Sequence, residues 1–329
     1  TITVAEEICR CLCLLSYENE LVGIMLSNHI LVALYCIYKG NLCDSACANM
    51  MAITLRNLSG NIEIIHRPLD INGRPETGRN RDTFEKLSVP ATRLEVKACE
   101  SIVKQEGFRV LGWILRDFHV NNLQLYRSTA MILHNLCKVP ELHDTLIEQG
   151  FMDIVRTVVV AAGHLVQDEY EDDDEYIDSE DATATATGNT TNSNSPSRTR
   201  ANTITTSGMH MLHKFDIFHL TTAIHLISQT PSCKASIVHG KVVSILASIS
   251  QDTSEISRYE IVSSLTHLSI TKDRDCGALL VKHGGVDLLI KLSRDAETLE
   301  TQQQCSAAIS NLSEHACVGG GNVSSLLLL

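Results

Sequence analysis

Aromatic residues are scarce in this sequence, at 4% of 329 residues with a single tryptophan. The apolar fraction of 44% is nevertheless enough for a sizeable core. Small and aliphatic side chains must therefore do most of the packing, as they do where helices stack closely.

The sequence also lacks the motifs of common catalytic and nucleotide-binding sites. We find no H-E-x-x-H, paired C-x-x-C, G-x-S-x-G, P-loop or Rossmann glycine pattern. The glycine-rich stretch VGGGN at 318–322 has no lysine of a nucleotide loop. Several of the fourteen histidines recur at equivalent positions of a repeat, which favours a structural role. We therefore expect no enzyme activity and no cofactor.

Basic residues are missing between Asp168 and Asp181, a segment with about ten acidic residues. The net charge of −12 is therefore concentrated there, and the remainder of the chain is nearly neutral. A nucleic-acid-binding protein would normally be basic, so nucleic acid is not expected as a partner.

A disulfide framework is not expected, because the twelve cysteines lie mostly in apolar, helix-like runs. This is typical of a reduced compartment and predicts a cytoplasmic protein, with a nuclear or cytoskeletal location as alternatives. The cluster Cys9-x-Cys11-x-Cys13 suits tetrahedral zinc poorly, since its successive members point about 200° apart on a helix. No metal site is therefore predicted.

One apolar run, 21–38, raises the question of a membrane span. Its centre carries Ser27-Asn28-His29, which favours two short helices over one spanning helix. The N-terminal residues show no signal peptide and lie within an apolar-periodic run.

A repeat emerges when the sequence is compared with itself. The pattern Leu/Ile-x-[Asn/His/Leu]-Leu/Ile-Ser/Cys recurs with a period of about 42 residues, and two larger gaps fit one period plus an insertion. We call the last residue of the pattern the anchor. The anchors are Ser16, Ser59, Cys137, Ser228, Ser269 and Ser313.

A glycine turn follows most anchors after about 13 to 16 residues. Gly150, Gly240 and the pair Gly284-Gly285 occupy it in the later units, and the second unit reaches Gly107 only after its insertion. The first unit has Asn28-His29 there. Glycine suits a sharp turn between helices because it tolerates positive φ.

Each unit is therefore predicted to hold a short first helix, a second helix after the turn, and a longer third helix ending at the anchor. Apolar residues recur at helical spacing in the third helices, as in Ile261, Leu265 and Leu268. The expected first helices are 141–149, 231–239 and 275–283, the second 151–162, 241–250 and 286–293, and the third about 46–59, 122–137, 214–228, 257–269 and 300–313.

The stretches LIEQGFMDIVRTV with AMILHNLC, and LVKHGGVDLLIKLS with CSAAISNLS, resemble armadillo repeats. The resemblance covers nearly all of the chain except two insertions, and HEAT-type repeats are the alternative. It implies an all-α fold, a right-handed superhelical α-solenoid of about five to six three-helix armadillo-type repeats. The chain starts in a third helix and stops in a second, which predicts a slice of a longer array, truncated at both ends.

Two insertions interrupt the repeat. The first, at about 63–98, is rich in arginine, glycine and proline, and is expected to be a solvated loop or a contact arm for an acidic partner or for the chain's own acidic segment. The second is acidic and then rich in Ser, Thr and Asn, which predicts disorder, with Ser195 and Thr203 as candidate phosphorylation sites. The predicted parts are armadillo repeats at 1–162, the disordered insertion at 163–208, and repeats of the same solenoid at 209–329.

Polar side chains recur two residues before the anchors. In armadillo proteins, asparagines of the third helices commonly bond the main chain of an extended peptide in the concave groove, because an amide offers both a donor and an acceptor. The resemblance implies a peptide-binding ladder of Asn57, Asn135, His267 and Asn311. The alternative is that these side chains cap their own helix or bond the neighbouring unit.

Importin-α-like adaptors also carry a tryptophan four residues before the groove asparagine. The corresponding positions here are Ile53, Met131, Ser263 and Ala307. The single tryptophan, Trp113, lies instead in a second helix, where Arg109, Trp113 and Arg116 form an i, i+4, i+7 stripe. This stripe is a candidate binding hot spot, with core packing of Trp113 as the alternative.

The sequence therefore predicts a non-catalytic protein–protein interaction scaffold that binds an extended partner segment along its concave face. One alternative is a nuclear transport adaptor, which the missing tryptophans disfavour. Another is a structural subunit of a large ciliary or cytoskeletal assembly, in which the array would be buried against its neighbours.

Overall fold

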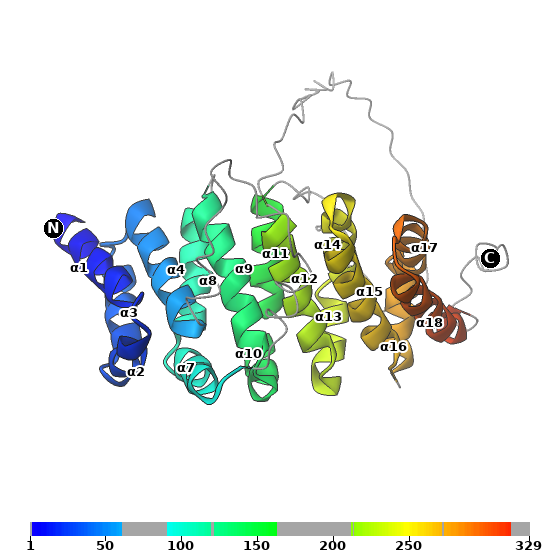
Figure 1. Cartoon of the computed structure of the whole chain (residues 1–329), viewed down its shortest axis with the longest axis horizontal. Helices are drawn as coiled ribbons and strands as arrows, with labels where there is room; N and C mark the ends of the chain where they lie inside the picture. The colour runs from blue at the N-terminus through cyan, green and yellow to red at the C-terminus, as the bar shows by residue number, and fades with distance from the viewer. Residues whose placement is uncertain are drawn as a thin grey trace, which may run out of the picture.

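Every regular element in the described part of the chain is helical, which confirms the all-α prediction. The helices stand side by side in a row that follows the order of the chain (Figure 1). The predictions for 163–208, including Ser195 and Thr203, and for 318–322 lie outside the described residues. This computed structural model describes residues 2–60, 91–119, 122–162, 212, 214–271 and 273–316.

The helices recur in the predicted order of first, second and third. The third helices are α1 (Ile2–Leu15), α4 (Ser45–Ser59), α9 (Leu123–Cys137), α12 (Lys214–Ser228), α15 (Glu255–Ser269) and α18 (Leu299–Ala316). The second helices are α3 (Ile30–Lys39), α8 (Gly107–Phe118), α11 (Phe151–Ala161), α14 (Val242–Ile249) and α17 (Gly285–Asp295). The first helices are α2 (Asn19–Ser27), α7 (Arg93–Lys104), α10 (His143–Glu148), α13 (Lys234–His239) and α16 (Arg274–Lys282).

Three short 3-10 turns complete the described elements. They are η1 (Pro140–Leu142), η3 (Pro231–Cys233) and η4 (Ser250–Asp252). The turns η1 and η3 lead directly into first helices and begin with proline, which fits a helix start because its missing N–H would have no partner there.

The third helices form one continuous layer. Each packs on the next, from α1 through α4, α9, α12 and α15 to α18, and these contacts are among the most extensive between helices. The helices α4 and α9 pack together although α7 and α8 come between them in the sequence. The layer therefore connects the units, and a single hydrophobic core runs through the chain beneath it.

The turn before each second helix has one residue in the left-handed region, directly before the helix begins. These residues are His29, Glu106, Gly150, Lys241 and Gly284, with φ between 55° and 91°. The predicted glycine takes this position at Gly150, and one of the predicted pair Gly284-Gly285 takes it in the last turn. In two other turns it falls to Glu106 and Lys241, one residue before the predicted Gly107 and Gly240.

The predicted first insertion ends too late in the sequence. Helix α7 begins at Arg93 behind a capping box, in which Thr92 Oγ1 accepts from the Glu95 amide and Glu95 accepts from the Thr92 amide. Prolines and glycines between Pro68 and Gly78 predict a loop, but the capping residues Thr92 and Glu95 start a helix before residue 98.

The apolar run at 21–38 forms two helices, α2 and α3, as the sequence predicted. Within the described ranges, no single helix has the length and hydropathy needed to cross a membrane. The pair α2 and α3 passes that test only when taken together, and it is bent by 69°.

Candidate functional site

Three of the four predicted ladder residues bond the preceding unit. The side-chain Nδ2 of Asn57 donates to Ser16 Oγ at 3.0 Å, and Asn311 Nδ2 donates to Ser269 Oγ at 3.0 Å. Asn135 Nδ2 donates in the same way to the Oγ of Ser59, at 3.2 Å. Each bond therefore joins an asparagine to the anchor serine of the third helix before it.

The anchor serines are oriented by their own helices. Their hydroxyl groups donate to the carbonyl oxygen three residues earlier, at 2.6 Å for Ser16, 2.8 Å for Ser59 and 2.7 Å for Ser269. With the hydrogen used in this way, the remaining lone pairs accept from the asparagine of the next unit. The motif Asn-Leu-Ser is thus an inter-unit connection in this chain.

Asn57 is wholly internal, which corrects its place in the peptide-binding ladder. Its side chain has no exposed area, and its Oδ1 accepts from Arg56 Nε at 3.2 Å and from Arg56 Nη2 at 3.0 Å. Both ends of the amide are therefore occupied by the protein itself. A peptide in the groove would therefore find neither end of this amide free.

Asn135 and Asn311 differ from Asn57 because they are only half buried. Neither Oδ1 accepts a hydrogen bond from the described residues. Gly60 permits the close approach of Asn135, since a Cβ on this glycine would lie 2.3 Å from Asn135 Nδ2. The serine bond fixes one end of each amide and leaves its carbonyl oxygen for an external donor.

His267, the fourth predicted ladder residue, is half buried in a polar cluster between α12 and α15. Its ring stacks on His225 with centroids 5.3 Å apart, and His225 Nδ1 lies 2.5 Å from Glu260 Oε2. Burial lowers the pKa of His267, and the neighbouring His225 and Lys234 lower it further. At neutral pH the ring is therefore uncharged and offers one donor and one acceptor.

A second histidine pair lies in the interior next to this cluster. His134 Nδ1 and His219 Nδ1 are 2.5 Å apart, and both side chains are buried between α9 and α12. Burial lowers the pKa of His134 and lowers that of His219 to about 3. One ring nitrogen must donate and the other accept, which requires both rings to be neutral or only one to be charged.

His134 and His225 are among the histidines that recur at equivalent positions of the repeat, whereas His219 and Glu260 could not be found from the sequence. Each lies nine residues before its anchor, where the sequence offers no recurring residue type. The pairs form across neighbouring third helices, and only the packing of α9, α12 and α15 brings them together.

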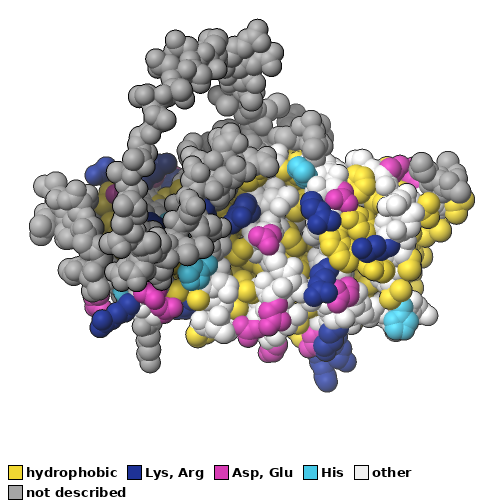
Figure 2. All heavy atoms as spheres, turned by 180° about the vertical axis from the view of Figure 1, so that it is seen from behind, with side chains coloured by type: hydrophobic (Ala, Val, Ile, Leu, Met, Phe, Trp, Pro, Cys, Tyr) yellow, Lys and Arg dark blue, Asp and Glu magenta, His cyan; other side chains and the backbone are white. Residues whose placement is uncertain are grey.

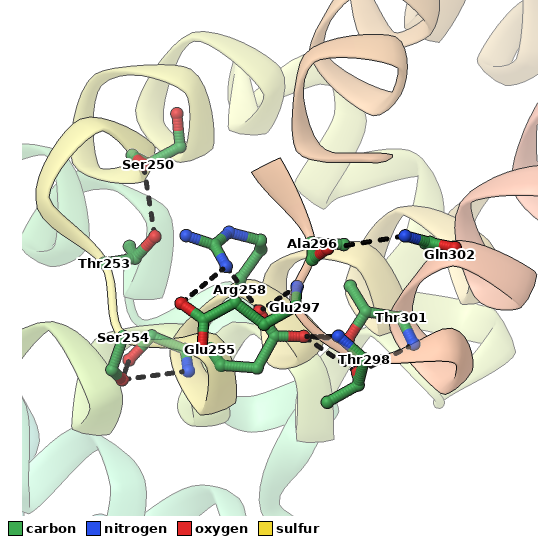
Figure 3. Close-up of polar contacts among 11 residues, drawn as sticks. Ser250, Thr253, Ser254, Glu255, Arg258, Ala296, Glu297, Thr298, Thr301 and Gln302 are labelled. Atoms are coloured by element: carbon green, nitrogen blue, oxygen red, sulfur yellow. Dashed lines mark hydrogen bonds and ion pairs between the residues drawn. The ribbon is translucent and has the colours of Figure 1, made fainter. Parts of the chain in front are cut away.

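Glu255 at the start of α15 holds the start of α18 (Figure 3). Its carboxylate accepts from the amides of Glu297 and Thr298 at 3.1 and 3.2 Å and from the Thr301 hydroxyl at 2.7 Å, and it is ion-paired with Arg258. Burial alone would raise the pKa of Glu255, but these hydrogen bonds outweigh it and lower the pKa. The cluster fixes one third helix on the next.

The three residues of the candidate hot spot contact other side chains of the same chain. Trp113 is half buried, with Tyr38 stacked on its ring at 5.6 Å and Lys39 Nζ 4.7 Å from its centroid. Arg109 and Arg116 are exposed and are ion-paired with Glu106 and Asp117, respectively. This geometry favours the alternative in which Trp113 packs between α3 and α8.

The surface carries no dominant charge in the view of Figure 2. Acidic, basic and histidine side chains are interspersed there with apolar and uncharged groups. Within the described ranges, no three His, Cys, Asp or Glu side chains meet in a group that could hold a metal ion.

The comparisons with known proteins show the fold alone. No family model and no curated protein matches the chain. A crystal structure of an engineered protein is similar over 96% of this chain and 92% of its own, with a TM-score of 0.54 and 15% identity. The helical architecture is therefore found along nearly the whole length of a solved structure, and this likeness assigns no function.

Proposed function

We propose that the chain is an armadillo-type solenoid that acts as a non-catalytic scaffold and binds an extended partner segment along its third-helix layer. The observation that carries the proposal is the half-exposed polar residue two positions before the anchor in three units, namely Asn135, His267 and Asn311. The repeated three-helix order and the continuous third-helix layer support the solenoid.

The chemistry of these side chains suits an extended backbone. A peptide in extended form has unpaired amide and carbonyl groups along its length, and affinity comes from pairing them. Asn135 and Asn311 each present a carbonyl oxygen as acceptor, while neutral His267 presents a donor or an acceptor. Because Asn57 is internal, we place the binding surface over α9 to α18 rather than over the whole row.

A library of linear peptides, selected on the immobilised chain, tests this proposal. Selected peptides should bind the variant Asn135→Ala/His267→Ala/Asn311→Ala at least about tenfold more weakly, since each lost hydrogen bond costs roughly 0.5–1.5 kcal/mol. Circular dichroism and the Tm show whether the variant keeps its fold.

The matched control is Arg109→Ala/Arg116→Ala, which removes two exposed side chains from a second helix. It should bind the selected peptides as the unchanged chain does. If the control loses binding and the triple variant keeps it, the hot spot on α8 is the binding surface and the third-helix proposal is wrong. A failure to enrich any linear peptide would also contradict the proposal.

A further inference from the structure

Arg127 lies on the open face of α9, in line with Asn135. Every residue of α9 from Leu125 to Leu136 is buried except Arg127 and Asn135. The two are eight residues apart, which is about 12 Å along a helix and keeps them on one face. A segment bound to Asn135 therefore lies on the face of the third-helix layer that also carries Arg127.

One internal hydrogen bond holds the guanidinium of Arg127. Its Nε donates to Oδ2 of Asp216 in α12 at 3.2 Å. The Asp216 side chain is 5% exposed and that of Arg127 is 43% exposed. A guanidinium has five N–H donors in a planar fork, and those on Nη1 and Nη2 have no partner among the described residues. Asp216 thus fixes the group and leaves its two NH2 ends for an external acceptor.

The arginines of α4 and α15 are used within the chain instead. Arg56 is 7% exposed and donates twice to Asn57. The side chain of Arg258 is 12% exposed and is ion-paired with Glu255. Arg127 differs from both because it is far more exposed and is bonded through one nitrogen.

The position of Arg127, ten residues before the anchor, carries a charge in one unit between α4 and α18. The equivalent residues of the other four third helices in this range are Asn49, Phe218, Tyr259 and Gln303. A charged group at this position therefore distinguishes one place along the layer from the rest.

The exposed charge around this place is positive. Apart from histidines, α9 and α12 contain three charged residues, namely Arg127, Lys214 and Asp216. Lys214 is exposed at the start of α12, four residues before Phe218, the α12 counterpart of Arg127. Because Asp216 is buried, the two helices present positive charge to a partner and attract a negative one.

We propose that the partner segment carries an aspartate or glutamate whose carboxylate binds the two NH2 groups of Arg127, with Lys214 adding to the attraction. The inference rests on the proposed function, because a segment that lies across Asn135 brings its side chains to Arg127. A carboxylate accepts two parallel N–H···O bonds from a guanidinium, and such charge-assisted bonds are roughly twice as strong as neutral ones. The acidic side chain thereby fixes where along the layer the segment lies.

Two libraries of linear peptides, selected on the immobilised full chain, test the inference. They have the same composition, except that one contains Asp and Glu and the other contains Asn and Gln in their place. The acidic library should yield peptides that bind at least about tenfold more tightly. Their affinity should fall as salt is added, because salt screens an exposed ion pair.

Substitution on both sides of the contact separates recognition from folding. Arg127→Gln should weaken a selected acidic peptide about tenfold, and replacing the acidic residue of the peptide by its amide should remove that effect. Arg109→Gln is the matched control, since the side chain of Arg109 is 51% exposed and is also ion-paired. It should bind as the unchanged chain does.

Circular dichroism shows whether each variant keeps its helices. If Arg127→Gln unfolds, Arg127→Lys is the second variant, because it keeps a positive charge beside Asp216 but lacks the planar fork. It should also bind the acidic peptide more weakly than the unchanged chain does.

Equal losses for the acidic peptide and its amide form would show that Arg127 only supports the fold, and would overturn the inference. Unchanged binding by a folded Arg127 variant would overturn it as well. Selected peptides that depend on Asn135, His267 and Asn311 but on no acidic residue would overturn it and leave the proposed function standing. Failure of both libraries to enrich any peptide would overturn both.

Discussion

At the scale of the residue, one motif has two environments. Asn57, Asn135 and Asn311 all precede an anchor by two positions, and all donate to the anchor serine before them. The sequence predicted that they were equivalent and left open whether they face a groove or a neighbour. Their burial could not be read from it, because the hydrogen bonds from Arg56 to Asn57 depend on side-chain conformation.

The difference in burial predicts different costs for the same substitution. Asn57→Ala should lower the free energy of unfolding by about 1–3 kcal/mol, since it removes the buried acceptor of the Arg56 guanidinium and the bond to Ser16. Asn311→Ala should cost less than about 1 kcal/mol, because Asn311 is only half buried and its side chain binds no buried charge. Urea denaturation measures both, and equal losses would contradict the assigned environments.

The lowered pKa of His219 predicts how the stability of the chain depends on pH. Its pKa is about 3 in the folded chain against an ordinary value of 6.5, so between these values the unfolded chain binds more protons. The stability of the fold that depends on a neutral His219 ring is complete above pH 6.5. It is lost as the pH falls toward 3. The cause is burial, which disfavours the charged ring.

The variant His219→Gln should therefore show a weaker decline of unfolding free energy between pH 7 and 5 than the unchanged chain. Denaturant titrations at several pH values give this slope, and the difference between the two proteins removes the contribution of other groups. Parallel curves would show that His219 titrates normally in the folded state.

At the scale of the element, the sequence predicted the helices closely. The third helices α4, α9, α12 and α15 begin within about two residues of their expected starts, since apolar periodicity and the anchor define them. The turn residue was less predictable. Glycine is favoured in the left-handed region but is not required there. In two turns the left-handed residue is therefore Glu106 or Lys241, each one residue away from the glycine that the sequence predicted.

Replacing the strained turn residue should stabilise the chain. Lys241 has φ of 58°, which disfavours a residue with a Cβ, so Lys241→Gly should raise the unfolding free energy by about 0.5 kcal/mol. Gly150→Ala should lower it by about 1 kcal/mol, because φ is 91° there. The nearest atom to a Cβ at Gly150 is Asp153 Oδ2 at 3.5 Å, so this control reports backbone conformation rather than a clash.

Thermal or urea denaturation compares these variants. An increase in unfolding free energy for Lys241→Gly and a decrease for Gly150→Ala support Lys241 as the left-handed residue of its turn. Destabilisation by Lys241→Gly as large as that of Gly150→Ala would show that the left-handed residue is not Lys241.

At the scale of the whole molecule, the third-helix layer gives the chain its continuity. The period of about 42 residues was visible in the sequence because each unit buries its third helix against the next. The histidine pairs and the Glu255 cluster were not visible, because they depend on how neighbouring third helices lie side by side.

Site-specific photocrosslinking tests most directly whether an extended partner lies along this layer. A photoreactive amino acid replaces Ala307, which is exposed on α18 four residues before Asn311, or Lys291, which is exposed on the second helix α17. With a peptide selected on the unchanged chain, the account predicts crosslinking at position 307 and none at position 291. Crosslinking at 291 with none at 307 would place the peptide on the second-helix layer and contradict the account.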